Sequence, residues 1–265
     1  MRPIIDVRDL WFAYEGRNWI LNGVDLQIFE GELLLIIGQN GCGKTTLAKH
    51  FNGLLKPTEG RVLVGGQDAS LCTTAELSRL VGYVFQNPDN QLFAPTVYDE
   101  VAFGLRNSGL TDHDSVVRSS LREVGLEDRV FDSPFGLSTG EKERLAIASV
   151  IAMQPKVLIL DEPTIGQDEV TTNKIMTIAE TLRQKGNTVI VITHDMELVA
   201  EWSERVVVMH DGDIKRVGPP QEVLCDIEFL REVHLSPPKA VEIGRSLGIS
   251  PTPLTVREIV EALIR

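Results

Sequence analysis

The feature that most constrains this chain is the segment of residues 38–45, Gly-Gln-Asn-Gly-Cys-Gly-Lys-Thr, which matches the phosphate-loop pattern G-x-x-x-x-G-K-[ST]. It follows the apolar run 33–37 and leads into a helical stretch at 45–51. In that strand–loop–helix order, backbone N–H groups and the positive end of the helix dipole face a bound anion. The segment therefore predicts a βα unit that binds a nucleotide. The alternative is a glycine-rich turn without a ligand, and the strand–loop–helix context argues against it.

The residue types of this loop fit separate tasks. Its glycines allow the backbone to curl around phosphate oxygens. Lys44 is expected to reach the β- and γ-phosphates, and the Thr45 hydroxyl to hold Mg²⁺. Cys42 is expected to contribute its backbone rather than its thiol. The candidate nucleotide-binding residues of the loop are Gly38, Asn40, Gly41, Cys42, Gly43, Lys44, Thr45 and Thr46.

Length and composition exclude several classes of protein. The 265 residues suffice for one large α/β domain and a small appendage. A net charge of −12 disfavours a nucleic-acid partner, because an acidic surface repels the phosphate backbone. The three cysteines are widely spaced, which indicates neither a disulfide framework nor a metal site and fits a reducing cytosol. No apolar run reaches the roughly 18 residues that span a bilayer, and residues 1–4 lack the core of a signal peptide. We expect a protein that is soluble or reaches a membrane through a partner.

Strands and helices alternate along most of the chain, and the strands are apolar throughout. This pattern predicts an α/β fold, with a mostly parallel sheet covered by helices on both faces. Residues 210–213, His-Asp-Gly-Asp, predict a hairpin turn, and 97–135 is helical without a strong strand. Strands are expected at 4–10, 24–28, 33–37, 61–64, 81–85, 157–160, 188–192, 205–209 and 214–217. Further helices are expected at 75–80, 140–152 and 169–184, and short helices follow the boundary at 219–220.

Polar residues follow three of the predicted strands, at the edge where open parallel sheets bind ligand. Asp161 is placed to hold Mg²⁺ through water, and Glu162 to orient or deprotonate the attacking water. Neighbouring carboxylates point to opposite sides of a strand, so they can serve different roles. His194 can contact a γ-phosphate, and Gln86 can reach Mg²⁺ or the lytic water. The alternatives are a turn with solvated acids and a structural histidine. The other histidines, at 50, 113, 210 and 234, are interpreted as surface or packing residues.

The segment Leu137-Ser138-Thr139-Gly140-Glu141 precedes a predicted helix and supports two interpretations. Ser138 and Glu141 have the spacing of a capping box, in which each side chain bonds a free backbone N–H of the first turn. The same helix start offers Ser138, the Gly140 amide and a helix dipole to a phosphate. Both roles stay open at this stage.

In their order along the chain, these motifs resemble the ATP-binding-cassette (ABC) ATPases over roughly residues 4–218. The resemblance implies a phosphate-loop ATPase fold with an N-terminal antiparallel β subdomain and a helical subdomain at about 90–152. It implies a head-to-tail dimer with shared sites for ATP and Mg²⁺, where Ser138 and Gly140 of one subunit close over ATP held by the other. It assigns Tyr14 to stacking on adenine, with core packing as the alternative, and Asp168 to the loop that spans the sites.

Residues 85–93, Phe-Gln-Asn-Pro-Asp-Asn-Gln-Leu-Phe, resemble the ATPase subunits of energy-coupling factor transporters, which include vitamin and cobalt or nickel importers. This likeness implies a second ATPase subunit, a membrane-embedded coupling subunit and a substrate-binding membrane subunit as partners. The chain would lie at the cytoplasmic face of the cell membrane. Leu92, Phe93 and Val97 would anchor a membrane subunit, and a helical extension at 219–265, with an apolar face in its last helix, would enlarge the dimer contact.

Three residues depart from the family pattern, namely Thr139, Glu141 and Gln167. They fit either a specialised half of an unequal pair or ordinary variation within the subfamily. Glu162 and His194 are retained, so the chain's own site is expected to hydrolyse ATP. The alternative function is a soluble ABC ATPase that acts as a nucleotide-gated scaffold. A small-molecule kinase fits less well, because it gives residues 137–141 and Glu162 no role.

Overall fold

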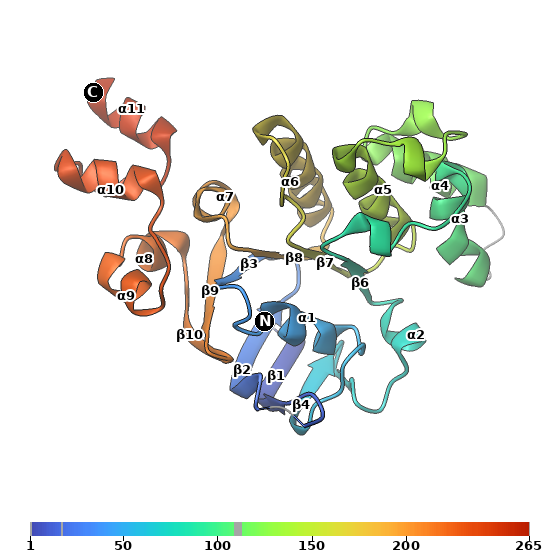
Figure 1. The fold of residues 1–265 in the computed structure, drawn as a ribbon, viewed down its shortest axis with the longest axis horizontal. Helices are drawn as coiled ribbons and strands as arrows, with labels where there is room; N and C mark the ends of the chain where they lie inside the picture. Colours follow the sequence, from blue (N-terminus) through green and yellow to red (C-terminus); the bar gives the residue numbers. More distant parts are fainter. Residues whose placement is uncertain (1, 17, 109–112, 265) are drawn as a thin grey trace.

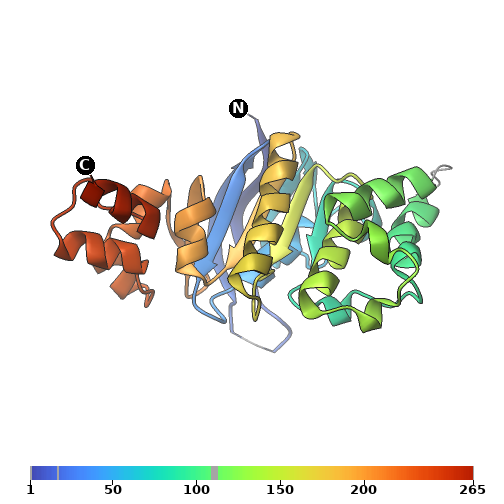
Figure 2. The same ribbon diagram turned by 90° about the horizontal axis from the view of Figure 1, so that it is seen from above.

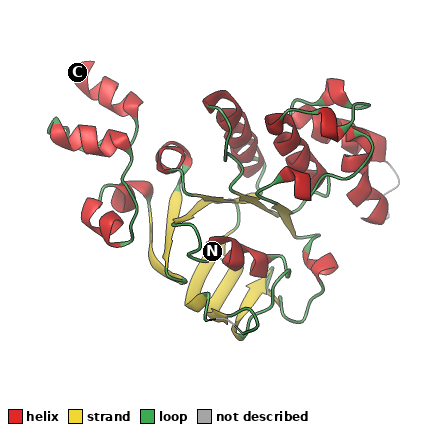
Figure 3. Cartoon of the chain, viewed as in Figure 1, coloured by secondary structure: helices red, strands yellow, loops and turns green. Residues whose placement is uncertain are grey.

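Two β-sheets form the centre of the molecule (Figures 1 and 3), and the computed structural model describes residues 2–16, 18–108 and 113–264. The smaller sheet is antiparallel in the described pairs, with the strand order β2-β1-β4-β5. Its strands are β1 (Pro3–Phe12), β2 (Leu21–Phe29), β4 (Glu59–Val64) and β5 (Gln67–Asp68). This sheet is the predicted N-terminal β subdomain.

The larger sheet has the order β10-β9-β3-β8-β7-β6. Strands β9, β3, β8, β7 and β6 pair with one another in parallel. Strand β10 lies at one edge and pairs antiparallel with β9. The strands are β3 (Leu33–Gly38), β6 (Val81–Val84), β7 (Val157–Asp161), β8 (Thr188–Thr193), β9 (Arg205–His210) and β10 (Asp213–Gly218). The predicted α/β fold with a mostly parallel sheet is confirmed.

The apolar strands explain why this sheet is buried on both faces. Successive side chains of a strand point to opposite faces, so a strand that is apolar at every position can be covered twice. Leu33 and Leu35 of β3 pack into one hydrophobic cluster with the helices of the upper layer in Figure 1. Leu34 and Ile36 pack into a second cluster with the antiparallel sheet and helix α1 (Lys44–Phe51).

The remaining helices lie around the sheets in groups. The helices of the main body are α2 (Thr74–Leu77), α3 (Val97–Ser108), α4 (His113–Glu123), α5 (Thr139–Ile151), α6 (Glu169–Gln184) and α7 (Met196–Trp202). The chain ends in α8 (Pro220–Leu224), α9 (Ile227–Glu232), α10 (Lys239–Ser246) and α11 (Val256–Ile264). Figure 2 shows α3, α4 and α5 at one end of the molecule and the C-terminal helices at the opposite end. Among the described residues, no helix is both long and apolar enough to cross a membrane.

The hairpin predicted at 210–213 is present, and its turn consists of Asp211 and Gly212 with φ values of 50° and 76°. Two elements were not predicted. Strand β5 is too short to give a pattern. Helix α7 is capped by Asp195, whose carboxylate accepts from the backbone N–H groups of Glu197 and Leu198 at 3.0 and 3.2 Å. That cap was a signal available in the sequence.

The apolar face predicted for the last helix is divided between the core and the surface. Leu254 and Ile259 are buried, with 6% and 7% of their surface exposed. Val256, Val260 and Leu263 are exposed to 63%, 49% and 65%. Part of this face therefore docks on the chain, and part of it remains an apolar surface.

Candidate functional site

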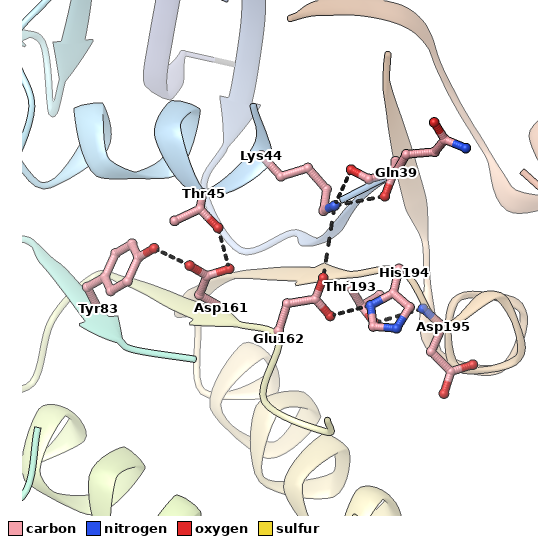
Figure 4. A network of polar contacts seen from close by, with 10 residues as sticks. Gln39, Lys44, Thr45, Tyr83, Asp161, Glu162, Thr193, His194 and Asp195 are labelled. Atoms are coloured by element: carbon pink, nitrogen blue, oxygen red, sulfur yellow. Dashed lines mark hydrogen bonds and ion pairs between the residues drawn. The ribbon is translucent and has the colours of Figure 1, made fainter. Parts of the chain in front are cut away.

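The predicted site residues converge at the carboxyl ends of β3, β7 and β8. Figure 4 shows Lys44 directed toward Glu162, Thr45 toward Asp161, and His194 toward Glu162. Each of these side chains ends a strand or follows one, and parallel strands bring their carboxyl ends to one edge of the sheet. The convergence therefore follows from the topology.

The phosphate loop needs glycine at defined positions. Gly38 and Gly43 have φ values of 153° and 105°, which L side chains rarely adopt. A Cβ at Gly38 would overlap the carbonyl oxygen of Met209, and one at Gly43 would lie 2.9 Å from Cδ2 of Leu21. The loop is thus held against β9 on one side and β2 on the other, with its backbone free to face a ligand.

Lys44 spans this loop with a buried side chain. Its Nζ donates to the carbonyl oxygens of Gly38 at 2.7 Å and Gln39 at 3.0 Å, and lies 4.0 Å from Oε1 of Glu162. The residue is only 6% exposed. A buried ammonium over a glycine-rich loop fits a polyanion such as a triphosphate.

Asp161 is held by two hydroxyl groups. Oγ1 of Thr45 donates to its Oδ1 at 3.1 Å, and the hydroxyl of Tyr83 donates to its Oδ2 at 2.6 Å. Burial, and then the Asp161 charge, raise the pKa of Tyr83 far above its ordinary value, so Tyr83 stays a donor. A hydroxyl and a carboxylate side by side are hard oxygen ligands of the kind that Mg²⁺ prefers. Sequence reasoning missed Tyr83, although a lone tyrosine in an apolar strand was a possible signal.

Glu162 is buried beside His194. Its Oε2 lies 2.9 Å from Nδ1 of His194, and its backbone N–H donates to the Ile192 carbonyl at 2.9 Å. The prediction that strand alternation separates Asp161 from Glu162 was wrong, because β7 ends at Asp161. Glu162 instead has φ 52°, a left-handed backbone that only a few per cent of non-glycine residues adopt. That turn, rather than the pleat, directs its carboxylate toward Lys44.

A small cavity joins the loop to the other candidates. It lies between α1 and the ends of β6 and β7. Its lining residues are Asn40, Gly41, Gly43, Lys44, Thr45, Thr46, Gln86, Glu162 and Ile165. An adjoining pocket is lined by Asn40, Glu162 and His194 together with neighbouring residues. The structure thus brings together six of the eight phosphate-loop candidates with Gln86, Glu162 and His194.

Tyr14 is connected to this region through an aromatic chain. Its ring lies 4.9 Å from that of Phe12, which lies 4.8 Å from the buried ring of His50 in α1. His50 Nδ1 is 2.7 Å from the carbonyl oxygen of Thr46, and burial lowers the pKa of His50. Tyr14 therefore packs on α1 through Phe12, yet 36% of its surface is exposed.

The comparisons with known proteins agree with this geometry. A family model for "ABC transporter" matches residues 21–165, which is more than half of the chain. The chain belongs to the ATP-binding-cassette family. This membership confirms the predicted fold and identifies the protein as an ABC-type ATPase.

Individual relatives place this cassette ATPase more narrowly. It is 45% identical to a putative ABC transporter ATP-binding protein of Caldanaerobacter subterraneus subsp. tengcongensis, covering 99% of this chain and 46% of that protein. It is 43% identical to the energy-coupling factor transporter ATP-binding protein EcfA of Methanocaldococcus jannaschii, covering 91% and 88%. The structure of cbiO1 from Clostridium perfringens, part of the ABC transporter complex cbiONQ, superimposes with a TM-score of 0.81 at 37% identity, covering 94% and 100%. The predicted likeness to energy-coupling factor ATPases is confirmed.

Ser138, Gly140 and Asp168 of the cassette ATPase are among the candidate residues that do not line its own cavity. Ser138 and Gly140 lie at the start of α5, and Asp168 caps α6 by accepting from the Thr171 N–H at 2.7 Å. That hydrogen bond holds the pKa of Asp168 below its ordinary value. A Cβ at Gly140 would lie 2.7 Å from Cγ2 of Thr171, so the two helix starts are in close contact.

The start of α5 forms the predicted capping box. Oε2 of Glu141 accepts from the Ser138 hydroxyl at 2.7 Å and from its backbone N–H at 2.9 Å. The hydroxyl bond is the main reason that the pKa of Glu141 lies below its ordinary value. Arg129 also lies 3.5 Å from this carboxylate. Glu141 is therefore committed to the cap, and its charge is directed toward Ser138 and Arg129.

The prediction of apolar anchors for a membrane subunit was partly wrong. Leu92 and Val97 are 4% and 0% exposed and belong to the core. Phe93 is 58% exposed, and its ring lies 4.8 Å from that of Phe103, which is 48% exposed. The exposed apolar feature of this region is thus the Phe93–Phe103 pair.

The segment that follows Gln86 is fastened to α5. The Gln91 amide donates to the Ala146 carbonyl at 3.0 Å, and Lys142 Nζ lies 2.7 Å from a carboxylate oxygen of Asp89. In the strand that precedes this segment, a Cβ at Gly82 would overlap Val150 of α5. Strand β6, the segment and the helix are therefore in close contact.

Proposed function

We propose that this chain is the ATP-hydrolysing subunit of an energy-coupling factor importer. It would hydrolyse Mg-ATP at a head-to-tail dimer interface and drive uptake of a vitamin or a transition-metal ion through membrane subunits. One observation carries the proposal: the buried Glu162 carboxylate lies 2.9 Å from His194 and 4.0 Å from Lys44, beside the phosphate loop.

In this proposal each side chain has a task in splitting the terminal phosphoanhydride bond. The loop backbone and Lys44 hold the phosphates. Glu162 orients the water whose oxygen attacks the γ-phosphorus and accepts its proton, while the bond to the ADP oxygen breaks. His194 holds Glu162 in position and contacts the γ-phosphate, and the Gln86 amide would reach Mg²⁺ or the attacking water.

Thr45 and Asp161 are the residues that would hold Mg²⁺, and Tyr83 would keep the Asp161 carboxylate oriented. When bound, Mg²⁺ would neutralise charge on the β- and γ-phosphate oxygens. Tyr14 would stack on the adenine ring, using its exposed face.

The proposed dimer gives a role to candidate residues that do not line the chain's own cavity. Ser138, Gly140 and Asp168 would act on ATP held by a second subunit, identical or different. We propose a nucleotide-binding domain at 1–218, with its helical subdomain at about 90–152, and an extension at 219–265. Because α11 exposes Val256, Val260 and Leu263, the extension offers an apolar face to the second ATPase subunit.

The membrane partners would meet the other end of the molecule. Phe93 and Phe103 form an exposed aromatic pair beside the segment that begins at Gln86. Exposed aromatic residues of this kind serve as anchors in protein interfaces. The coupling subunit would bind there and hold the chain at the cytoplasmic face of the membrane, with the substrate-binding subunit alongside.

Light scattering tests the dimer. With Glu162→Gln slowing hydrolysis, saturating Mg-ATP should raise the measured mass to that of a dimer, and removal of ATP should return it to a monomer. A lasting monomer with Mg-ATP and the companion ATPase subunit both supplied would contradict the proposal.

Copurification with detergent-solubilised membrane proteins encoded by neighbouring genes tests the transport role. A chain that dimerises but binds none of them would favour the soluble scaffold.

A further inference from the structure

The C-terminal extension touches the phosphate loop through one hydrogen bond. The Gln39 side-chain amide donates to the backbone carbonyl oxygen of His234 at 3.1 Å. Gln39 is the second residue of the loop, and its own carbonyl oxygen accepts from Nζ of Lys44 at 3.0 Å. In Figure 4 its side chain points away from Lys44. A single loop residue thus joins the phosphate-binding lysine to the extension.

The His234 carbonyl is positioned by the end of α9. The Leu235 N–H donates to the Leu230 carbonyl at 2.7 Å, and the His234 N–H donates to the Arg231 carbonyl at 3.0 Å. These are the paired bonds of a Schellman motif, whose left-handed position is usually a glycine. Here that position is His234, with φ 56°. His234 therefore adopts a left-handed backbone at the position that glycine usually occupies in this motif.

The His234 ring has a packing partner on the main body. Its centroid lies 5.5 Å from that of His210, at an interplanar angle of 61°. His210 ends β9, and the residue before it, Met209, is the one whose carbonyl a Cβ at Gly38 would overlap. The ring contact thus holds the extension beside the strand that supports the first glycine of the loop.

We propose that the segment around His234 braces the phosphate loop, which makes Gln39 and His234 positioning residues for nucleotide binding. Glycine-rich backbone has many accessible conformations, and fixing it before binding reduces the cost of ordering it. The brace holds the Gln39 peptide and, through its carbonyl, the Lys44 ammonium. By linkage, bound nucleotide must stabilise the seated extension by the same factor. This inference rests on the proposed binding of ATP at the loop.

The test removes the donor without shortening the side chain. Gln39→Met keeps the length of Gln39 and loses the amide. Gln221→Met is the matched control, because the Gln221 amide donates to the Thr252 carbonyl at 2.8 Å within the extension, away from the loop. Mg-ADP affinity is measured by titration calorimetry, and KM and kcat are measured for Mg-ATP hydrolysis.

Gln39→Met should raise the ADP dissociation constant and the ATP KM by about two- to tenfold, the factor that a net hydrogen bond supplies. Its kcat should stay within about twofold of the parent value, because the brace acts on binding rather than on the attacking water. Gln221→Met should match the parent in all three values. Parent-like affinity in Gln39→Met would overturn the proposal.

Hydrogen exchange provides a readout that does not depend on any variant. Mg-ADP should slow exchange in the peptide covering residues 230–236 of the parent, and this protection should be lost in Gln39→Met. If nucleotide leaves this peptide unchanged in the parent, the brace is wrong. A parent chain that binds no ADP contradicts the proposed function instead, so the failures of the two proposals are distinguishable.

Discussion

The sheet edge around Glu162 and the helix α5 each contain a nearly fully buried glutamate, and the two differ in their partners. Glu162 is 6% exposed and lies near His194 and Lys44. Glu143 of α5 is 2% exposed, and within the described structure its Oε1 has no hydrogen-bond partner. Burial raises the pKa of Glu143 to about 8. A buried carboxylate with an unpaired oxygen costs stability, so the partners rather than the burial distinguish the proposed catalytic glutamate.

The largest effect is expected at the sheet edge. Glu162→Gln should bind Mg-ATP but lower turnover at least about a hundredfold, because the amide cannot accept a proton from water. Steady-state hydrolysis and equilibrium binding measure the two quantities. Glu201→Gln, at an exposed position of α7, is the control and should retain parent turnover. Near-normal turnover in Glu162→Gln would remove the contrast between the two glutamates.

Glu143→Gln tests whether the buried glutamate of α5 lowers stability. With its pKa raised from 4.5 to about 8 in the folded chain, Glu143 lowers stability progressively as pH rises through that window. The rise of the pKa from 4.5 to about 8 corresponds to about 5 kcal/mol, so the substitution should raise the melting temperature by about 10 °C or more near pH 8 and above. Its effect should shrink toward about pH 4.5, where the carboxyl is protonated in both states. Melting curves that differ equally at every pH would contradict this assignment.

Tyr83→Phe tests the support of the edge carboxylate. The substitution keeps the ring and removes the hydroxyl that donates to Asp161 at 2.6 Å. We expect the Mg²⁺ concentration for half-maximal hydrolysis to rise about tenfold, as is typical when the residue that orients a metal ligand is lost. A magnesium titration of turnover measures this. An unchanged titration would show that Thr45 alone positions Asp161.

The smallest effect is expected at the start of α5. Ser138→Ala should lower the free energy of unfolding by about 1 kcal/mol through loss of the cap. The chain offers a matched control in Thr73 and Glu76, which form a second capping box at α2. Thr73→Ala should cost a similar amount in denaturant unfolding. Only Ser138→Ala should also weaken the ATP-dependent dimer, and equal dimerisation of both variants would limit Ser138 to capping.

The sequence predicts most of this fold because its signals are local. The apolar run of β3, the bounds of α6 and the hairpin turn at Asp211 and Gly212 all arise from neighbouring residues. The grouping of Lys44, Asp161 and His194 follows as well, because parallel topology brings strand ends together. These positions needed no knowledge of distant contacts.

The remaining features depend on packing, which a pattern of residue types does not specify. Leu92 and Val97 were predicted as surface anchors because they are apolar, but the direction in which they point is set by the neighbouring helices. Tyr83 belongs to the site only because β6 lies beside β7. The contact of Gln39 with His234 joins residues from opposite ends of the chain.

The close seat of α5 on β6 has a mechanical consequence. At Gly82 of β6 there is no room for a side chain beside Val150 of α5. The Gln91 amide donates a hydrogen bond to the same helix at the Ala146 carbonyl. A displacement of Phe93 should therefore move α5, and Ser138 at its N-terminus, with little relative motion between them. In the proposed complex, a displacement of the membrane subunit at Phe93 and a displacement of Ser138 at the second subunit's nucleotide would therefore be coupled through one rigid unit.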